Sequence, residues 1–159
     1  MQGFTLTEAL VTILIISTAL LGLLKLQIHS LQYQQNATYQ LVASNSAQEI
    51  IDRIQANTIG FNNGNYFLTG QENSNCLNAG CTPNDMAQHD TYEWHTQLSN
   101  QLPQASGIIC RDSTPKDGIP GNPSCDSANT SDVPAVIKIW WQEHGSTSWK
   151  LLTQSFAGI

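Results

Sequence analysis

The stretch GFTLTEALVTILIISTALLGLLK (residues 3–25) decides the fold of this chain. From Phe4 to Leu24 it contains 21 residues, no proline and one ionisable side chain, that of Glu8. A helix of this length spans about 30 Å, which is the thickness of the hydrocarbon core of a bilayer. The stretch therefore predicts a helix that crosses a membrane near the N-terminus.

Two simple explanations of this stretch are a secretory signal peptide and a plain membrane anchor. A signal peptide needs a basic start and a small-residue cleavage site, but Met1 and Gln2 are not basic and Leu23-Leu24-Lys25-Leu26 is no such site. A plain anchor explains the length but not Glu8, because a carboxylate inside a spanning helix is costly and usually has a partner. Both explanations stay open as alternatives.

The rest of the chain is polar but weakly charged. Charged residues make up 11% of its 159 residues, whereas Asn, Gln, Ser and Thr together account for 56. Typical soluble domains are about 25% charged. The formal net charge of −6 and the lack of clustered Lys and Arg argue against bulk electrostatic binding to nucleic acid.

The helical pattern continues beyond Lys25. Small or apolar residues recur at spacings of three and four on one predicted helix face, at Ala37, Leu41, Ser44, Ala47, Ile51 and Ile54. Glu49 and Arg53 form an i,i+4 pair in the favoured order. Asn57-Thr58-Ile59-Gly60 predicts the end of the helix, with Gly60 in a left-handed cap. We therefore expect one helix of about 55 residues whose second half packs on the outer domain. A coiled coil is the weaker alternative, because no heptad pattern is sustained.

A second helix is predicted after a loop over residues 61–81. Thr82 is its expected N-cap, with Pro83 at the first helical position, and Leu102-Pro103 ends it. Its apolar positions fall at multiples of four and are expected to face the core: Met86, Trp94, Leu98 and Leu102.

The C-terminal third predicts a small antiparallel sheet. Strands are expected at residues 108–111, 136–143 and 149–156, with a long loop over 112–132 and a hairpin at the end. In the middle strand Ile137, Ile139 and Trp141 share one face, and Lys138, Trp140 and Gln142 share the other. Because Trp140 and Trp141 face opposite ways, one should be core, and the other could be an exposed contact for a neighbouring minor subunit. The predicted fold class is α+β.

All four cysteines lie in the polar part of the chain, at Cys76, Cys81, Cys110 and Cys125. Sequence allows three disulfide connectivities, of which local pairing, Cys76–Cys81 and Cys110–Cys125, is the simplest. If these segments lie outside the inner membrane, they are in an oxidising compartment, where disulfides persist. A zinc site is a weaker alternative, because the chain has no Cys-x-x-Cys unit.

No arrangement of residues predicts catalysis, a cofactor or a metal centre. His89, His95 and His144 are scattered and are expected at the surface, and Asp85, Asp90 and Glu93 are expected to be helix caps or solvated. The four aspartates of the long loop could offer oxygens to Ca²⁺, although no ligand-spaced motif joins them: Asp112, Asp117, Asp126 and Asp132.

The run Gly3-Phe4-Thr5-Leu6-Thr7-Glu8, placed directly ahead of the apolar helix, resembles the processing signal of type IV pilins and type II secretion pseudopilins. The resemblance implies that a prepilin peptidase cuts after Gly3 and N-methylates Phe4. Family leaders usually carry Lys or Arg, and Met1-Gln2 does not. The resemblance also implies that Glu8 pairs with the N-terminal amine of a neighbouring subunit. In a dry filament core that pairing would relieve a burial cost of several kcal/mol.

Further segments narrow this resemblance to the PilV family of minor pilins, also called type IV pilus modification proteins. These segments are Gly22-Leu23, Arg53-Ile54-Gln55-Ala56-Asn57, Gly60, Cys81-Thr82-Pro83-Asn84-Asp85-Met86-Ala87, Asp90, Trp94 and Leu102-Pro103. The likeness covers the first 110 residues in pieces and is only general beyond Cys110.

The resemblance implies the type IV pilin fold, a long N-terminal helix packed on a small antiparallel sheet. It divides the chain into a leader (1–3), a membrane or filament-core half of the helix (4–25) and a periplasmic or extracellular head (26–159). Such subunits are not enzymes and need no cofactor. They wait in the inner membrane, then join a minor-pilin complex that primes the pilus, at or near its tip.

The implied partners are other minor pilins, the major pilin, prepilin peptidase, the inner membrane and, for some members, a tip adhesin. The expectation leaves two alternatives open, which are a minor pseudopilin of a type II secretion system and a tip-located pilin that binds a ligand or DNA. Few basic residues follow the helices, so nucleic acid is a weak candidate.

Overall fold

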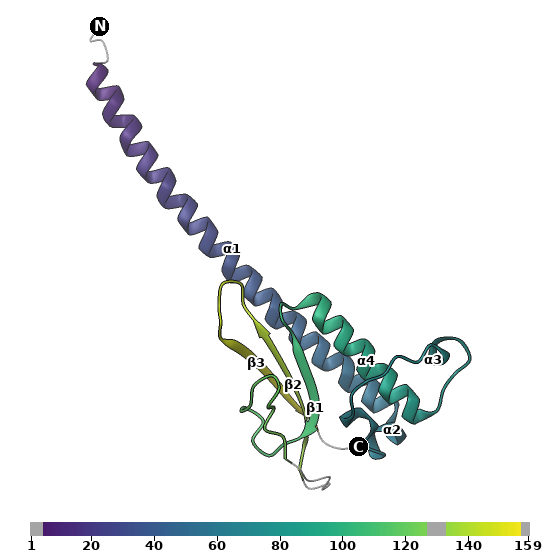
Figure 1. Ribbon diagram of the computed structural model, residues 1–159. Helices are drawn as coiled ribbons and strands as arrows, with labels where there is room; N and C mark the ends of the chain where they lie inside the picture. Colours follow the sequence, from purple (N-terminus) through teal and green to yellow (C-terminus); the bar gives the residue numbers. More distant parts are fainter. Residues whose placement is uncertain (1–4, 127–132, 157–159) are drawn as a thin grey trace. The chain divides into compact units, whose positions relative to one another are not determined.

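The computed structural model describes residues 5–126 and 133–156 and has two compact units, Met1–Thr38 and Tyr39–Ile159. Helix α1 (Leu6–Ala56) contributes to both (Figure 1). Among the described residues, the N-terminal unit consists of α1 and the residue before it. The long N-terminal helix predicted from sequence is therefore present, ending one residue before Asn57.

In its described residues, the C-terminal unit adds four short or medium helices and three strands to the last turns of α1. They are α2 (Thr58–Asn62), the 3₁₀ turn η1 (Asn65–Phe67), α3 (Asn75–Asn78), α4 (Pro83–Gln101), β1 (Ser106–Arg111), β2 (Ala135–Gln142) and β3 (Trp149–Phe156). The strands form one antiparallel sheet in the order β1-β2-β3, with Ile109 opposite Ile137 and Ile139 opposite Leu152. The chain thus has an α+β fold, as predicted.

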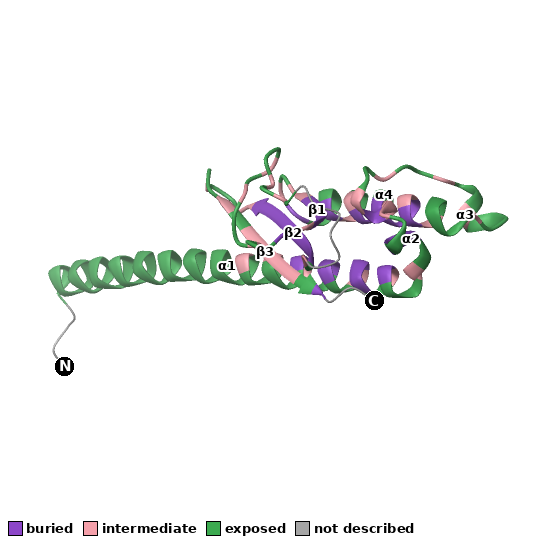
Figure 2. Cartoon of the chain, turned by 90° about the horizontal axis from the view of Figure 1, so that it is seen from below, coloured by how far each residue is buried: buried purple, intermediate pink, exposed green. Residues whose placement is uncertain are grey.

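The core lies between one face of this sheet and the two long helices of the unit. Buried residues gather on the last turns of α1, on one side of α4 and on β2 (Figure 2). Trp94 of α4 is almost fully buried, and its indole Nε1 donates to the backbone carbonyl of Ser46 in α1 at 3.0 Å. Gly107 of β1 leaves room for this ring, because a Cβ there would clash with Trp94 and Leu98.

The buried face of α1 differs from the predicted one. Its buried residues are Ala43, Ser46, Ala47, Ile50, Ile51 and Ile54. Ala37, Leu41 and Ser44 are exposed, so the prediction was wrong for these three. Positions 47, 51 and 54 fit both stripes, and only the contact with the sheet and α4 selects the one that contains Ala43 and Ile50.

The end of α1 falls where predicted, but Gly60 does not cap it. Gly60 lies inside α2 and is buried, and the side chain of Asn57 accepts a hydrogen bond from its backbone N–H at 3.1 Å. A Cβ at Gly60 would lie 2.6 Å from the carbonyl oxygen of Pro83, so this glycine allows α2 to approach the start of α4. The region predicted as loop, residues 61–81, also contains η1 and α3.

Helix α4 has the predicted ends. The Thr82 hydroxyl accepts from the backbone N–H of Asp85 at 3.2 Å, Pro83 is at the first helical position, and Leu102 is the C-cap. Of its predicted apolar stripe, Trp94, Leu98 and Leu102 are buried, whereas Met86 is only partly so. The three predicted strands are confirmed within two residues at each end.

Candidate functional site

The first candidate site is the apolar half of α1. Every residue from Thr5 to Gln35 is exposed, including large side chains such as Leu6, Ile13 and Leu21. By length and composition this helix could cross a membrane. An uncovered apolar surface of this extent requires a lipid or protein environment to shield it from water.

Three hydroxyl side chains of this half, those of Thr12, Ser17 and Thr18, form hydrogen bonds within the helix. Thr12 donates to the carbonyl of Ala9 at 2.8 Å, and Ser17 donates to that of Leu14 at 2.9 Å. Thr18 likewise donates to the carbonyl of Ile15. These internal bonds remove most of the cost of placing a hydroxyl in an apolar surrounding.

Glu8 is different from these hydroxyl residues. It lies in the first turn of α1, and its carboxylate has no hydrogen-bond or ion-pair partner among residues 5–126 and 133–156. A carboxylate near the N-terminus of a helix is favoured by the helix dipole, but in an apolar surrounding it still needs a counter-charge. Gly3 and Phe4, the predicted processing positions, lie outside the described residues.

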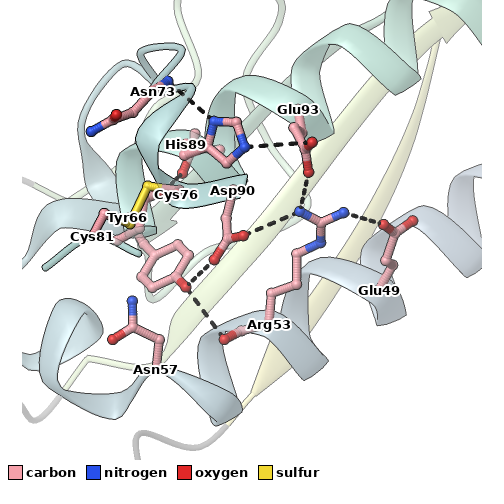
Figure 3. A network of polar contacts seen from close by, with 12 residues as sticks. Glu49, Arg53, Asn57, Tyr66, Asn73, Cys76, Cys81, His89, Asp90 and Glu93 are labelled. Atoms are coloured by element: carbon pink, nitrogen blue, oxygen red, sulfur yellow. Dashed lines mark hydrogen bonds and ion pairs between the residues drawn. A yellow bond between two sulfur atoms is a disulfide. The ribbon is translucent and has the colours of Figure 1, made fainter. Parts of the chain in front are cut away.

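The second candidate site is a network of charged side chains between α1 and α4 (Figure 3). Arg53 of α1 donates to Glu49 at 2.8 Å, to Asp90 at 3.1 Å and to Glu93 at 2.7 Å. Burial alone would lower the pKa of Arg53, but its hydrogen bonds to Glu93, Glu49 and Asp90 together outweigh burial and raise it. The predicted Glu49–Arg53 pair is therefore confirmed, as one arm of a larger network.

Tyr66 and His89 extend this network. The Tyr66 hydroxyl donates to Asp90 at 2.7 Å, and burial, followed by this bond, raises the pKa of Tyr66. His89 Nδ1 accepts from the backbone N–H of Asn73 at 3.2 Å, while its Nε2 lies 3.5 Å from Glu93 (Figure 3). This arrangement joins α4 to the segment that precedes α3.

The network corrects two predictions. His89 and Asp90, expected at the surface, are 4% and 8% exposed. The apolar periodicity of the helix did not indicate their burial, because polar residues that are buried with hydrogen-bond partners do not contribute to that pattern. His95 is also partly buried, and burial lowers its pKa. The network has the features of a structural brace, since Arg53 neutralises carboxylates from two helices.

The structure joins the four cysteines in the local pairing. Cys76 is bonded to Cys81 with a Cα–Cα distance of 4.8 Å, and Cys110 is bonded to Cys125 with a distance of 6.1 Å. The first bridge closes the turn that contains α3, and the second ties the end of β1 to the following loop. Cys110, Cys125 and Asp112 lie close enough to hold a metal ion, but the two sulfurs are already bonded to each other.

The third candidate site is the loop after β1, which is held onto the outer face of the sheet by Lys138. This side chain, in the middle of β2, is fully buried and forms an ion pair with the equally buried Asp112. Its Nζ also donates to Asp117 Oδ1 at 3.0 Å and to the carbonyl oxygen of Pro123 at 2.8 Å. The hydrogen bond from Lys138 is the main reason that the pKa of Asp117 is lowered.

Two of the four aspartates that could have offered oxygens to calcium contact an ammonium group instead. Asp112 and Asp117 bind Lys138, and Asp126 accepts from the backbone N–H of Ser113 at 2.7 Å. That bond is the main reason that the pKa of Asp126 is lowered. Asp132 lies outside the described residues.

The same loop explains the two tryptophans. Trp140 and Trp141 are 2% and 4% exposed, so the expectation that one of them is an exposed contact was wrong. Trp141 faces the core, while the indole Nε1 of Trp140 donates to the carbonyl of Gly118 in the loop at 3.3 Å. A signal was available, because Lys138 is flanked on its own face by Val136 and Trp140. Large apolar residues on a strand face indicate that another segment of the protein covers that face.

No protein-family model matches this chain, and neither does any curated protein or solved structure. The assignment of a function therefore rests on the apolar helix with Glu8, the braced and cross-linked C-terminal unit, and the sequence motif around Gly3.

Proposed function

We propose that this chain is a minor pilin, a non-enzymatic subunit that is inserted in the inner membrane and then incorporated in a complex that primes type IV pilus assembly. The observation that carries the proposal is the exposed apolar half of α1 with one carboxylate in its first turn, that of Glu8, which has no partner among the described residues. The motif Gly3-Phe4-Thr5-Leu6-Thr7-Glu8 directly before that helix supports it.

The proposed role of Glu8 follows from electrostatics. Helices such as α1 would pack against one another in a filament core with little water, where an unpaired carboxylate costs several kcal/mol. After cleavage behind Gly3, the new amine of Phe4 in a neighbouring subunit can supply the counter-charge. The cost is relieved in one axial register only, so the pair would determine how a subunit enters the filament.

The C-terminal unit suits a position outside the inner membrane. Its two disulfides are stable in an oxidising compartment. The Arg53 network and the Lys138 loop hold its helices and sheet together without a ligand. We propose that this unit is the periplasmic and later surface-exposed head that contacts other minor pilins, the major pilin or a tip adhesin.

The processing step is the most direct test. The full-length chain is expressed with and without a prepilin peptidase, and the N-terminal residue and intact mass are measured. We expect an N-methylated Phe4 start only when the peptidase is present. Gly3→Val should block cleavage, whereas Gln2→Ala, one residue away, should not. An unchanged Met1 start in the presence of the peptidase would contradict the proposal and favour a plain membrane anchor.

A second experiment distinguishes a pilus from a secretion pseudopilus. The tagged chain is purified from envelope fractions of cells that contain both systems. We expect the major pilin and other minor pilins to co-purify with it. Recovery with pseudopilins linked to a secretin, and without pilins, would assign the chain to a type II secretion system instead.

A further inference from the structure

The contact between Lys138 and Asp112 joins two charged side chains that are both shielded from solvent. Both side chains are 0% exposed, and Asp112 directly follows β1 while Lys138 lies on the adjacent strand. The backbone N–H of Asp112 donates to the carbonyl of Pro134 at 3.1 Å, which fixes the backbone of Asp112 at the end of the β1–β2 ladder. Lys138 lies opposite Ile108 in that ladder, so its long side chain reaches along the face of the sheet to Asp112. Keeping two charges away from water in this way carries a large desolvation cost, which their mutual attraction must offset.

The two oxygens of the Asp112 carboxylate have different surroundings. Oδ1 accepts from the backbone N–H of Thr114 at 2.7 Å and from its hydroxyl at 3.3 Å. Oδ2 lies against the Lys138 amine. Donors fixed on one oxygen of a carbonyl carbon stabilise the negative charge that develops when a nucleophile attacks that carbon.

A second carboxylate completes the arrangement. Asp117 Oδ1 lies 3.0 Å from Lys138 Nζ, and Asp117 Oδ2 accepts from the Thr114 hydroxyl at 3.0 Å. Asp117 is half exposed, so it can exchange protons with solvent. The site therefore contains an amine nucleophile, a carboxyl carbon beside it, oxyanion donors and a proton carrier.

We propose that Lys138 and Asp112 become joined by an intramolecular amide bond once the C-terminal unit has folded, with Asp117 as the proton carrier. The ammonium passes one proton to Asp117, and the resulting amine attacks Cγ of Asp112. The charge of the tetrahedral intermediate develops on Oδ1, next to Thr114.

The reaction ends when the Cγ–Oδ2 bond breaks and Oδ2 leaves as water. Both protons of that water come from the former ammonium, one of them through Asp117, which returns to a carboxylate. Nζ keeps one hydrogen, and nothing is oxidised or reduced. Fixed proximity of amine and carboxyl replaces the activation that such a condensation otherwise needs. The product replaces two buried charges by a neutral amide.

The mass of the folded protein tests this proposal without any variant. Full-length protein purified in detergent should be lighter by one water molecule than the chain with its two disulfides. After reduction, alkylation and trypsin digestion, the bond after Lys138 should stay uncut. Residues 112–116 should then appear linked to residues 117–150. The proposal would be overturned if the intact protein, measured before reduction, showed no loss of water and trypsin cleaved after Lys138. Lys138 and Asp112 would then form an ion pair only.

Two variants test the role of Asp117. Asp117→Asn keeps an oxygen that can accept from Lys138 but cannot carry the proton, so we expect the lost water to be regained in its mass. Asp126→Asn, in the same loop but bound to Ser113, should retain the linked mass. Tryptophan fluorescence like that of the wild type would show that each variant is folded. A linked Asp117→Asn chain would contradict the assignment of the proton carrier.

Discussion

Arg53 links α1 to α4 through charged contacts. Its guanidinium group binds three carboxylates, and one of them, that of Asp90, is buried and also accepts from Tyr66. Removal of the cation would leave that carboxylate buried without its counter-charge. The hydrogen bond from Tyr66 cannot compensate for this, because it supplies no charge.

The Arg53→Met variant should therefore be destabilised by about 2 kcal/mol, a figure reduced from that of a fully buried pair because Arg53 is partly exposed. Thermal unfolding followed by tryptophan fluorescence measures this, since all four tryptophans lie in the C-terminal unit. Lys150→Met is the matched control, because its pair with Glu143 is 3.7 Å long and half exposed. Equal effects of the two substitutions would contradict the role given to Arg53.

His95 gives the stability a predicted pH dependence. Burial lowers its pKa in the folded state, so the unfolded chain binds a proton more readily. Stability is then fully present above the ordinary histidine pKa of about 6.5 and falls as the pH drops below it. Unfolding midpoints from about pH 7.5 to about pH 5 should decrease for the wild type and decrease less for His95→Gln. Parallel curves for the two proteins would rule out this contribution.

At the scale of elements, the start of α4 is a cap whose value can be measured. Thr82→Ala removes the hydroxyl that accepts from Asp85 N–H, and this should cost about 1 kcal/mol of unfolding free energy. Thr96→Ala is the matched control, because Thr96 is an exposed threonine inside the same helix that bonds only to the preceding turn. Its loss should be neutral or slightly stabilising, since alanine is the better helix former. A control as damaging as Thr82→Ala would show that the cap has no special effect.

The elements were predictable where a local signal governs them. The Thr82-Pro83 start and the Leu102-Pro103 end of α4 are backbone signals that act without tertiary contacts, and the structure has both. The buried stripe of α1 was only half predictable. Ala47 and Ile54 lie on both candidate faces of the helix. Which of the two faces is buried depends on the surface against which the helix packs.

Contacts between residues close in the sequence were predictable, whereas contacts between residues far apart in the sequence were not. The i,i+4 pair of Glu49 and Arg53 was found, but Asp90, 37 residues after Arg53, was not. Lys138 was placed on the strand face opposite Ile137, and its apolar neighbours Val136 and Trp140 indicate that this face is covered. Which segment covers it was not predictable, because no local pattern predicts where a loop of that length folds back.

At the scale of the whole molecule, the two units differ in whether their charged side chains have partners. Within residues 5–126 and 133–156, the C-terminal unit pairs its buried Asp90, Asp112 and Lys138 internally, whereas Glu8 in the apolar half of α1 has no partner. If Glu8 acts in assembly, its loss should affect the joining of subunits and leave membrane insertion intact.

The Glu8→Ala variant should therefore fractionate with the membrane like the wild type but be absent, or reduced at least about tenfold, in sheared pili, because a lost charge pair in an apolar site is worth several kcal/mol. Immunoblots of membrane and pilus fractions measure both. Thr12→Ala, one turn further along and internally bonded, should assemble normally. Normal incorporation of Glu8→Ala would refute the assembly role.

The order of the disulfides has a consequence for biosynthesis. Each bridge joins a cysteine to the next one along the chain, Cys76 to Cys81 and Cys110 to Cys125. As the polypeptide is made, every second cysteine therefore meets its correct partner as the most recent thiol. Oxidation in order of appearance yields the final pairing directly, without the slow exchange that crossed bridges require. We therefore expect the chain to reach its native disulfides with an oxidant alone, without an isomerase.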